Sequence, residues 1–202
     1  TLSSSSAASD VYKRQPEEEV EGIMESREIR NWLDRCSIVD KLALLCSVHP
    51  LDACKMTNEM TCRMSRTDRV VNVRSRGSHI LSPRLTDGGI SLTIAGASLA
   101  NDLNTSPVPE FGKTEEESDF PGIPRVCIVD DAIPFVGKGR NVMHGYISGA
   151  DSHIIPGQPC LVIDSKGTLV AHGTPLTSHL EMQFLRKGIA VKVRDGAFKQ
   201  DE

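Results

Sequence analysis

A short basic loop interrupted by glycines is the part of this sequence best suited to hold phosphate groups. It reads Lys138-Gly139-Arg140-Asn141 and runs on to Gly145. Lys138 and Arg140 are cations that can pair with phosphate oxygens, and the two glycines lack side chains that would keep a ligand from the backbone. Asn141 could contact a sugar or a base edge. The competing interpretation is a helix C-cap that leads into a strand, with its charges merely solvated.

Further polar residues follow the loop along the chain and could extend the same surface. The candidates are His144, Arg186, Lys187, Lys192 and Arg194. His144 would otherwise be an exposed strand residue, and Arg186 and Lys187 would otherwise complement the C-terminal end of a helix. Few aromatic residues are available to stack on bases. This favours recognition of duplex shape over reading of a single strand.

A second basic segment lies upstream. Residues 61–94 hold six arginines against Asp68 and Asp87, although the whole chain has a net charge of −4 and a pI of 5.9. An acidic chain does not bind nucleic acid through bulk charge, but local phosphate contacts suffice. The candidate additional contacts are Arg66, Arg69, Arg74 and Arg84. A solvated β-hairpin face that favours arginine explains the segment equally well.

The elements around the basic loop can be predicted from periodicity and turn residues. A strand over 125–129 leads to a short helix over 132–136, which Asp130 or Asp131 could cap. Two apolar runs at 160–163 and 168–173 predict a pair of strands. Ser178 and Glu181 fit a capping box that starts a helix, and Gly188 ends it. The closing strand, 190–194, alternates apolar and basic residues, so one face fills a barrel and the other presents cations.

The upstream part has a different pattern. Apolar residues at spacings of three and four over 26–48 predict one or two amphipathic helices. Residues 60–96 alternate instead, with turns at Gly77 and at Gly88-Gly89, which predicts a three-stranded meander. The expected fold is therefore α+β: a small helical and β-meander subdomain over 16–100, followed by a β pseudo-barrel over 123–198. Residues 101–122, rich in proline and glutamate, are expected to form an acidic linker.

The first residues call for a separate interpretation. Residues 5–15 are similar to the in-frame translation of a transposon adapter used to prepare sequencing libraries, so we expect residues 1–15 to be a disordered, artefactual tail. The alternative is an ordinary disordered tail rich in serine and alanine. On the adapter interpretation native sequence begins near Pro16, and the chain is expected to be the C-terminal part of a longer enzyme.

The order of these pieces resembles the PUA domain, a small RNA-binding pseudo-barrel. The resemblance rests on the short helix, the loop of residues 138–145, the Pro156-Gly157 turn, the paired strands, the capped helix and the basic closing strand. Upstream, residues 65–73 and 84–97 are similar to the subdomain that precedes the PUA domain in archaeosine tRNA-guanine transglycosylases and in short stand-alone relatives. The ending, residues 188–194, is similar to the end of those enzymes.

This resemblance implies that the chain binds tRNA in the cytoplasm, so that a separate or fused catalytic barrel can exchange guanine 15 for a precursor base. A (β/α)₈ barrel needs about 250 residues, so it is not within this chain. The family's catalytic aspartates and zinc-binding cysteines lie in that barrel, and none is carried over. We therefore expect no catalytic residue, cofactor or metal here, and the six cysteines contain no CxxC pair. No apolar run approaches the ~20 residues that a membrane helix needs.

Two other functions remain open at this point. A stand-alone PUA protein in ribosome assembly or translation initiation also joins a small domain to a PUA domain, and its partner would be a ribosomal subunit. A metabolic enzyme could carry the PUA domain as an appendage. The block from Arg84 to Ala97 favours the transglycosylase interpretation over both.

Overall fold

A computed structural model describes residues 33–67, 69–84, 86–112 and 119–198. The chain divides into two units, residues 1–37 and residues 38–202. Of the first, only residues 33–37 are described, and they are helical. Two predictions concern residues outside those described. They are the artefactual tail at residues 1–15 and the acidic run of the expected linker at residues 115–117.

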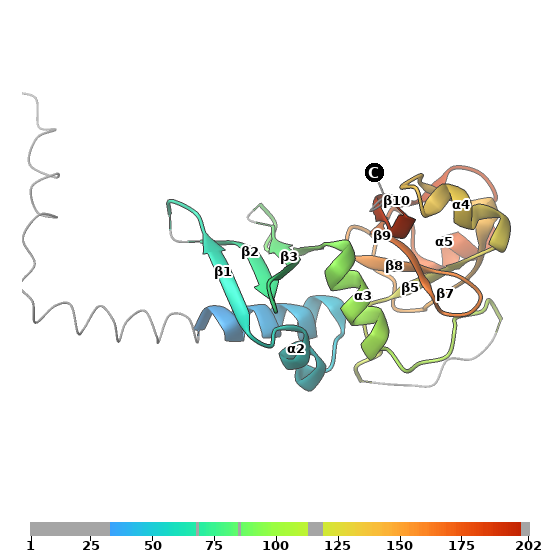
Figure 1. The fold of residues 1–202 in the computed structure, drawn as a ribbon. Coiled ribbons are helices and arrows are strands. Elements are labelled where there is room, and N and C mark those ends of the chain that lie inside the picture. The colour runs from blue at the N-terminus through green and yellow to red at the C-terminus, as the bar shows by residue number, and fades with distance from the viewer. Residues whose placement is uncertain (1–32, 68, 85, 113–118, 199–202) are drawn as a thin grey trace, which may run out of the picture. The chain divides into compact units, whose positions relative to one another are not determined.

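The N-terminal part of the larger unit is a helical layer on an antiparallel sheet (Figure 1). Its sheet has the order β1-β2-β3-β4. Residues 33–46 are helical, and this helix ends at residue 46. The remaining elements are α2 (Pro50–Met56), β1 (Met60–Met64), β2 (Val70–Ser75), β3 (Ser78–Pro83), β4 (Ile90–Leu92) and α3 (Ile94–Leu103).

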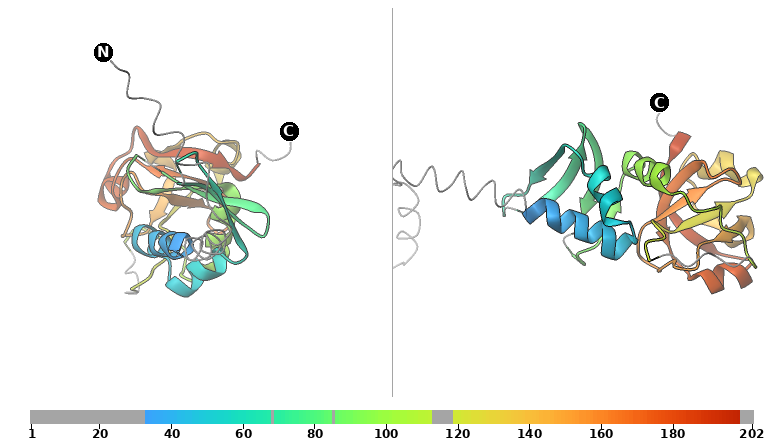
Figure 2. Two further views of the ribbon diagram at one scale, coloured as in Figure 1. Left: turned by 90° about the vertical axis from the view of Figure 1, so that its left-hand side faces the viewer. Right: turned by 90° about the horizontal axis from the view of Figure 1, so that it is seen from below.

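One face of this sheet is apolar and is covered by helices. Ile38 and Leu42 from the helical layer form a buried cluster with Val73, Ile80 and Leu81 from the strands. Figure 2 shows the helical layer along this face. Burying each of these side chains contributes about 1.5–3 kcal/mol to the free energy of folding, so the cluster stabilises the packing of the sheet against the helices.

The C-terminal part is a six-stranded, nearly closed sheet with the order β6-β10-β9-β8-β5-β7. Its strands are β5 (Arg125–Ile128), β6 (Val142–Met143), β7 (Ile147–Ala150), β8 (Cys160–Ile163), β9 (Leu169–Pro175) and β10 (Ile189–Gly196). Its helical segments are η2 (Asp130–Ala132), α4 (Ile133–Val136), η3 (His144–Tyr146) and α5 (His179–Phe184). Every pair is antiparallel except β5 with β8. The α+β class and the pseudo-barrel predicted from the sequence are confirmed.

Local signals in the barrel behave as predicted, except at the start of α4 and at the end of α5, which ends at Phe184 and not at Gly188. The capping box is present: the Ser178 hydroxyl accepts from the Glu181 amide, and the Glu181 carboxylate accepts from the Ser178 amide. The carboxylate bond lowers the pKa of Glu181. Neither Asp130 nor Asp131 caps α4, because the 3₁₀ turn η2 intervenes, so that prediction was wrong.

The upstream part has one strand more than predicted, and two of its helices, α2 and α3, lie outside the predicted helical range of 26–48. β1 precedes the three expected strands, and Ile94, which the alternation placed in a strand, begins α3. Thr93 caps this helix, because its hydroxyl accepts from the Gly96 amide. The threonine hydroxyl also donates to the backbone carbonyls of β3, so the cap and the sheet are fixed together.

The limits of the two domains and of the linker at 101–122 remain predictions. Several contacts near the linker are relevant to them. Residues 101–103, assigned to the linker, complete α3. Val108 packs against the first apolar cluster, and Phe111 packs against the barrel interior. The first cluster also contains Cys127 and Leu161 from the barrel strands. Apolar packing is therefore continuous across the expected boundary within the described residues.

Candidate nucleic-acid interface

The basic loop is held in place by α4 on one side and by β10 on the other. The Gly139 amide donates to the Val136 carbonyl at 2.8 Å, which closes the end of α4. Gly139 has a φ of +89°, a conformation that residues with a side chain adopt only with strain. The chain reverses here, and the Asn141 side-chain oxygen then accepts from the Val193 amide of β10 at 3.0 Å. Lys138 and Arg140 on either side of Gly139 are both exposed.

Close backbone packing brings β10 up to this loop. A Cβ atom at Gly196 would lie 2.1 Å from the Gly137 carbonyl oxygen and 2.7 Å from the Gly139 nitrogen. Only glycine permits that approach. The Phe198 amide also donates to the Gly137 carbonyl at 3.0 Å. The loop is thus a fixed extension of the β10 edge and can present its cations in a defined position.

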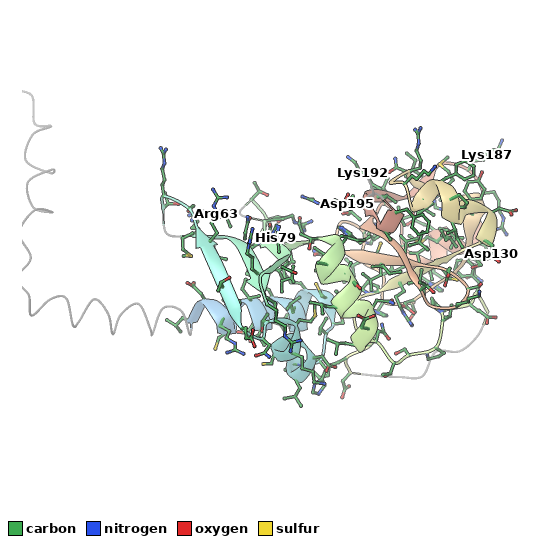
Figure 3. The ribbon with its side chains drawn as sticks, in the orientation of Figure 1. Arg63, His79, Asp130, Lys187, Lys192 and Asp195 are labelled. Atoms are coloured by element: carbon green, nitrogen blue, oxygen red, sulfur yellow. The ribbon has the colours of Figure 1, made fainter. Side chains whose placement is uncertain are left out.

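Six cations lie on β10 or in the segments that lead into β6 and β10. Lys192 and Arg194 lie on β10 and are exposed, and Arg186 and Lys187 lie in the turn that leads into it. The turn is joined to η3, because the His144 amide donates to the Gly188 carbonyl at 3.1 Å. We call the six the β10 surface; its members are Lys138, Arg140, Arg186, Lys187, Lys192 and Arg194. Figure 3 shows Lys187 and Lys192 on the same margin of the barrel.

The charges of the β10 surface are not neutralised within the part of the chain that the structure describes. No ion pair joins any of its six cations to a carboxylate among the described residues. The half-buried Asp195 lies between Arg194 and the end of β10, and Figure 3 shows it near Lys192. One carboxylate among six cations leaves a net positive edge in a chain that is acidic overall. Such an edge attracts an anionic ligand.

Two residues of the predicted set have structural roles instead. The Asn141 side-chain oxygen is engaged by β10, which leaves only its amide nitrogen for a ligand. His144 is 2% exposed, and burial lowers its pKa, although the nearby Glu181 opposes the change. A buried, neutral imidazole offers a phosphate no charge. Neighbouring residues along the chain contain no sign of this burial, because His144 begins η3 and its amide bonds to the distant Gly188 carbonyl.

The predicted arginines of the upstream segment also separate into two kinds. Arg84 bonds to Asp87 at 3.0 Å and to the Gly157 carbonyl at 3.2 Å, so it joins β3 to the barrel turn. Arg66, Arg69 and Arg74 are exposed on the β1–β2 hairpin. The bond to Arg84 and a bond from the Gly89 amide lower the pKa of Asp87, with the amide as the larger cause. Arg84 is therefore a structural residue, whereas the other three are exposed and, among the described residues, form no ion pair, although Arg74 donates to the Gly77 carbonyl at 3.4 Å.

Sequence reasoning missed the residue that joins the proline-rich segment to the barrel. Arg125 is 5% exposed and begins β5. Its guanidinium donates to the Ser106 and Pro107 carbonyls at 3.0 and 2.7 Å, and to the buried Asp151 carboxylate at 3.0 and 3.2 Å. An arginine at the head of an apolar strand is an unusual core residue, and that was the available signal.

The described residues contain no cluster suited to metal binding. No group of three or more His, Cys, Asp and Glu side chains comes together among them. Burial raises the pKa of the Cys46 thiol to about 12 and raises that of Cys160 further from its ordinary value. Both thiols are therefore protonated and unreactive at neutral pH. None of the described helices has the length and apolar character to cross a membrane.

Comparison with known proteins agrees with this geometry. Residues 124–197 match the PUA domain family. These residues form a PUA domain. The tRNA-guanine(15) transglycosylase of Thermococcus onnurineus is 31% identical to this chain over 127 residues, which are 63% of the chain and 19% of that enzyme. The enzyme of Thermococcus kodakarensis is 32% identical over the same length and shares. The chain thus spans about a fifth of the length of these relatives.

Similarity in fold extends beyond the PUA domain. The crystal structure of a hypothetical protein from Pyrococcus horikoshii matches with a TM-score of 0.59 and 23% identity, over 83% of this chain and 92% of that one. This likeness concerns the fold alone. It covers more of the chain than the PUA domain does, so the helical and β-meander part and the barrel occur together in that protein as well.

Proposed function

We propose that this chain is the RNA-binding part of a tRNA-guanine transglycosylase, and that it holds tRNA while a catalytic barrel elsewhere in the protein, or in a partner, carries out base exchange. One observation supports this assignment above others. The similarity to the transglycosylases covers 127 residues, whereas the PUA domain occupies only residues 124–197. Most of the remaining similarity must therefore precede the PUA domain. A PUA protein unrelated to the transglycosylases would not be expected to share sequence similarity with them upstream of the PUA domain.

The β10 surface supports the proposed mode of binding. Its six exposed cations can contact phosphates, and phosphate contacts position a protein on nucleic acid without reading sequence. Gly139, between Lys138 and Arg140, has no side chain that would cover the backbone there. His144 is excluded from the proposed contacts because it is buried, and Asn141 keeps only its amide nitrogen as a donor.

The test measures tRNA binding at a series of salt concentrations, for the wild type and for a variant in which two cations of the loop are replaced by neutral residues. In Lys138→Gln/Arg140→Gln each lost contact removes about one unit from the slope of log affinity against log salt. Over a fourfold increase in salt, two contacts correspond to roughly a tenfold difference in the loss of affinity. We expect the variant to bind tRNA more weakly at low salt and to lose correspondingly less affinity as salt rises. Fluorescence anisotropy with a labelled tRNA measures both quantities.

The matched control removes the same charge elsewhere. Lys55 lies on α2 and Lys166 lies in the β8–β9 turn, and both are exposed. Lys55→Gln/Lys166→Gln should bind as the wild type does. Because phosphate contacts do not read bases, the effect of the loop variant should be similar for tRNAs of different sequence. Unchanged affinity and slope in the loop variant would contradict the β10 surface. Failure of the wild-type chain to bind tRNA would contradict the function itself.

A further inference from the structure

The solvent face of the β1–β4 sheet is a second cationic surface, separate from the β10 surface. Paired residues of antiparallel strands point to the same side of a sheet. Arg63 pairs with Asn72, and Thr61 pairs with Arg74, so these four side chains share one face. The neighbouring pair, Cys62 with Val73, points to the other face and into the apolar cluster. Figure 3 shows Arg63 and His79 on the side of the sheet away from helical residues 38–46.

A chain of hydrogen bonds fixes the polar groups of this face. His79 pairs with Arg74 across β2 and β3. The His79 Nε2 lies 3.0 Å from the Ser82 hydroxyl, and that hydroxyl donates to the Asn72 side-chain oxygen at 3.3 Å. With its oxygen occupied, the Asn72 amide nitrogen is left as a donor. We call Arg63, Asn72, Arg74 and His79 the sheet face.

Within the part of the chain that the structure describes, no ion pair balances the charges of the sheet face. Arg63 and Arg74 are diagonal neighbours on adjacent strands, and like charges at that spacing repel. The four strands of the sheet contain no Asp or Glu, and among the described residues Asp87, the nearest downstream acid, is already paired with Arg84. Arg66 and Arg69 add two exposed cations in the adjoining β1–β2 turn. An anionic ligand with many hydrogen-bond acceptors would offset the repulsion between these arginines.

The same face lacks what a protein partner would require. Protein interfaces depend on buried aromatic and large aliphatic anchors at their centre. All the large apolar side chains of β1–β4 are buried or half-buried, so no such anchor is exposed there. Guanidinium groups, in contrast, match phosphate oxygens in a planar, two-pronged geometry. The similarity to the transglycosylases also extends upstream of the PUA domain, toward this sheet.

We propose that the sheet face binds the phosphate backbone of the same RNA that the β10 surface holds. This inference rests on the proposed function. Two surfaces joined in one chain convert the second contact into an intramolecular one, so each strengthens the other without a new partner. Arg63 and Arg74 supply the charge, Asn72 supplies a neutral donor, and His79 orients that donor through Ser82. Arg84 is not part of the surface, because its guanidinium is committed to Asp87 and Gly157.

The experiment compares Arg63→Gln/Arg74→Gln with the wild type, the loop variant and the Lys55→Gln/Lys166→Gln control. Glutamine keeps much of the aliphatic stem, and both arginines are exposed, so folding should be unchanged in a thermal melt. We expect the sheet-face variant to bind tRNA more weakly than the wild type. Its slope of log affinity against log salt should be smaller in magnitude by about two units, so over a fourfold rise in salt its loss of affinity should be roughly tenfold smaller. Arg63→Lys/Arg74→Lys should restore most of the slope, because the charge returns.

The outcomes separate this inference from the proposed function. If the wild type binds tRNA and the sheet-face variant matches it in affinity and slope, the inference is overturned while the function stands, and an acidic protein becomes the better partner for this face. If the lysine variant fails to restore the slope although it folds, the face does not act through phosphate charge and the inference is also overturned. A wild-type chain that does not bind tRNA contradicts the function on which both depend.

Discussion

Replacing Asp151 by asparagine should destabilise the PUA domain far more than an equal change at the surface. Asp151 is an isolated acidic partner in the interior: its side chain is 5% exposed, and that of Arg125 is 6% exposed. The carboxylate accepts from the Arg125 backbone amide at 2.7 Å and from the guanidinium at 3.0 and 3.2 Å. Asparagine has nearly the same shape but no charge. The guanidinium would therefore stay buried without its counterion.

The expected cost follows from that buried charge. Breaking a buried ion pair by removing one partner costs about 3–5 kcal/mol. A domain of 60–100 residues loses roughly 4–8 °C of melting temperature per kcal/mol, so the fall should be about 12–40 °C. Natural domains have only about 5–15 kcal/mol of stability, so this is a large fraction of the total. The segment at Ser106 and Pro107 should loosen at the same time, because Arg125 holds its carbonyls.

The assay is urea unfolding followed by circular dichroism, with two comparisons. Arg84 and Asp87 form an ion pair at the same 3.0 Å distance, but their side chains are 24% and 54% exposed, so Asp87→Asn should cost clearly less. Arg125→Met combined with Asp151→Asn removes the stranded charge and should recover part of the stability lost by Asp151→Asn alone. Equal losses for the buried and the exposed aspartate, or a further loss in the double variant, would refute the reasoning.

Two further predictions follow from burial. Burial lowers the pKa of His172 from 6.5 to about 4, with Asp195 opposing the shift and Arg194 adding to it, so the folded state prefers the neutral ring. Stability should be level above pH 6.5 and fall as pH drops from 6.5 toward 4. His172→Leu should make that fall shallower in urea titrations, and the buried His144, whose pKa is also lowered, should account for part of what remains. An equally steep fall in the variant would assign it to another group. Iodoacetamide at pH 8 should label the exposed Cys54 in the native protein, but Cys46 and Cys160 only after unfolding, as peptide mass spectrometry can measure. Native labelling of Cys160 at the rate of Cys54 would contradict its burial.

The elements that were predicted correctly depend on short-range signals. The capping box at Ser178 and Glu181 is complete within four residues, and the turn at Asp164–Gly167 closes by bonds to the Asp164 side chain and backbone. The apolar runs of β8 and β9 correspond to strands that are largely buried, and the alternation in β10 reflects one face packed into the barrel. These features need no knowledge of distant residues. The fold class followed from them and from the order in which they occur.

The elements that were missed depend on distant partners. α3 has a low content of large apolar residues, and its small residues are useful because β3 lies close: a Cβ at Gly96 would lie 2.0 Å from the Ile80 carbonyl oxygen. β1 is short, and it acquires strand geometry by pairing with β2. The burial of His144 depends on the turn at Gly188, 44 positions away, whose carbonyl accepts from its amide. Periodicity within a window contains none of this information.

Arginine shows most clearly why the site could be only partly predicted. Arg125 is neutralised by Asp151, 26 positions away, and Arg84 reaches Gly157, 73 positions away, so both have structural partners that composition cannot reveal. Arg63 and Arg74 have no acid in any strand of their sheet. The sequence locates positive charge, but only the fold determines which charges are already balanced. The charges that the fold leaves unpaired among the described residues, on the β10 surface and on the sheet face, are those that we propose contact an RNA backbone.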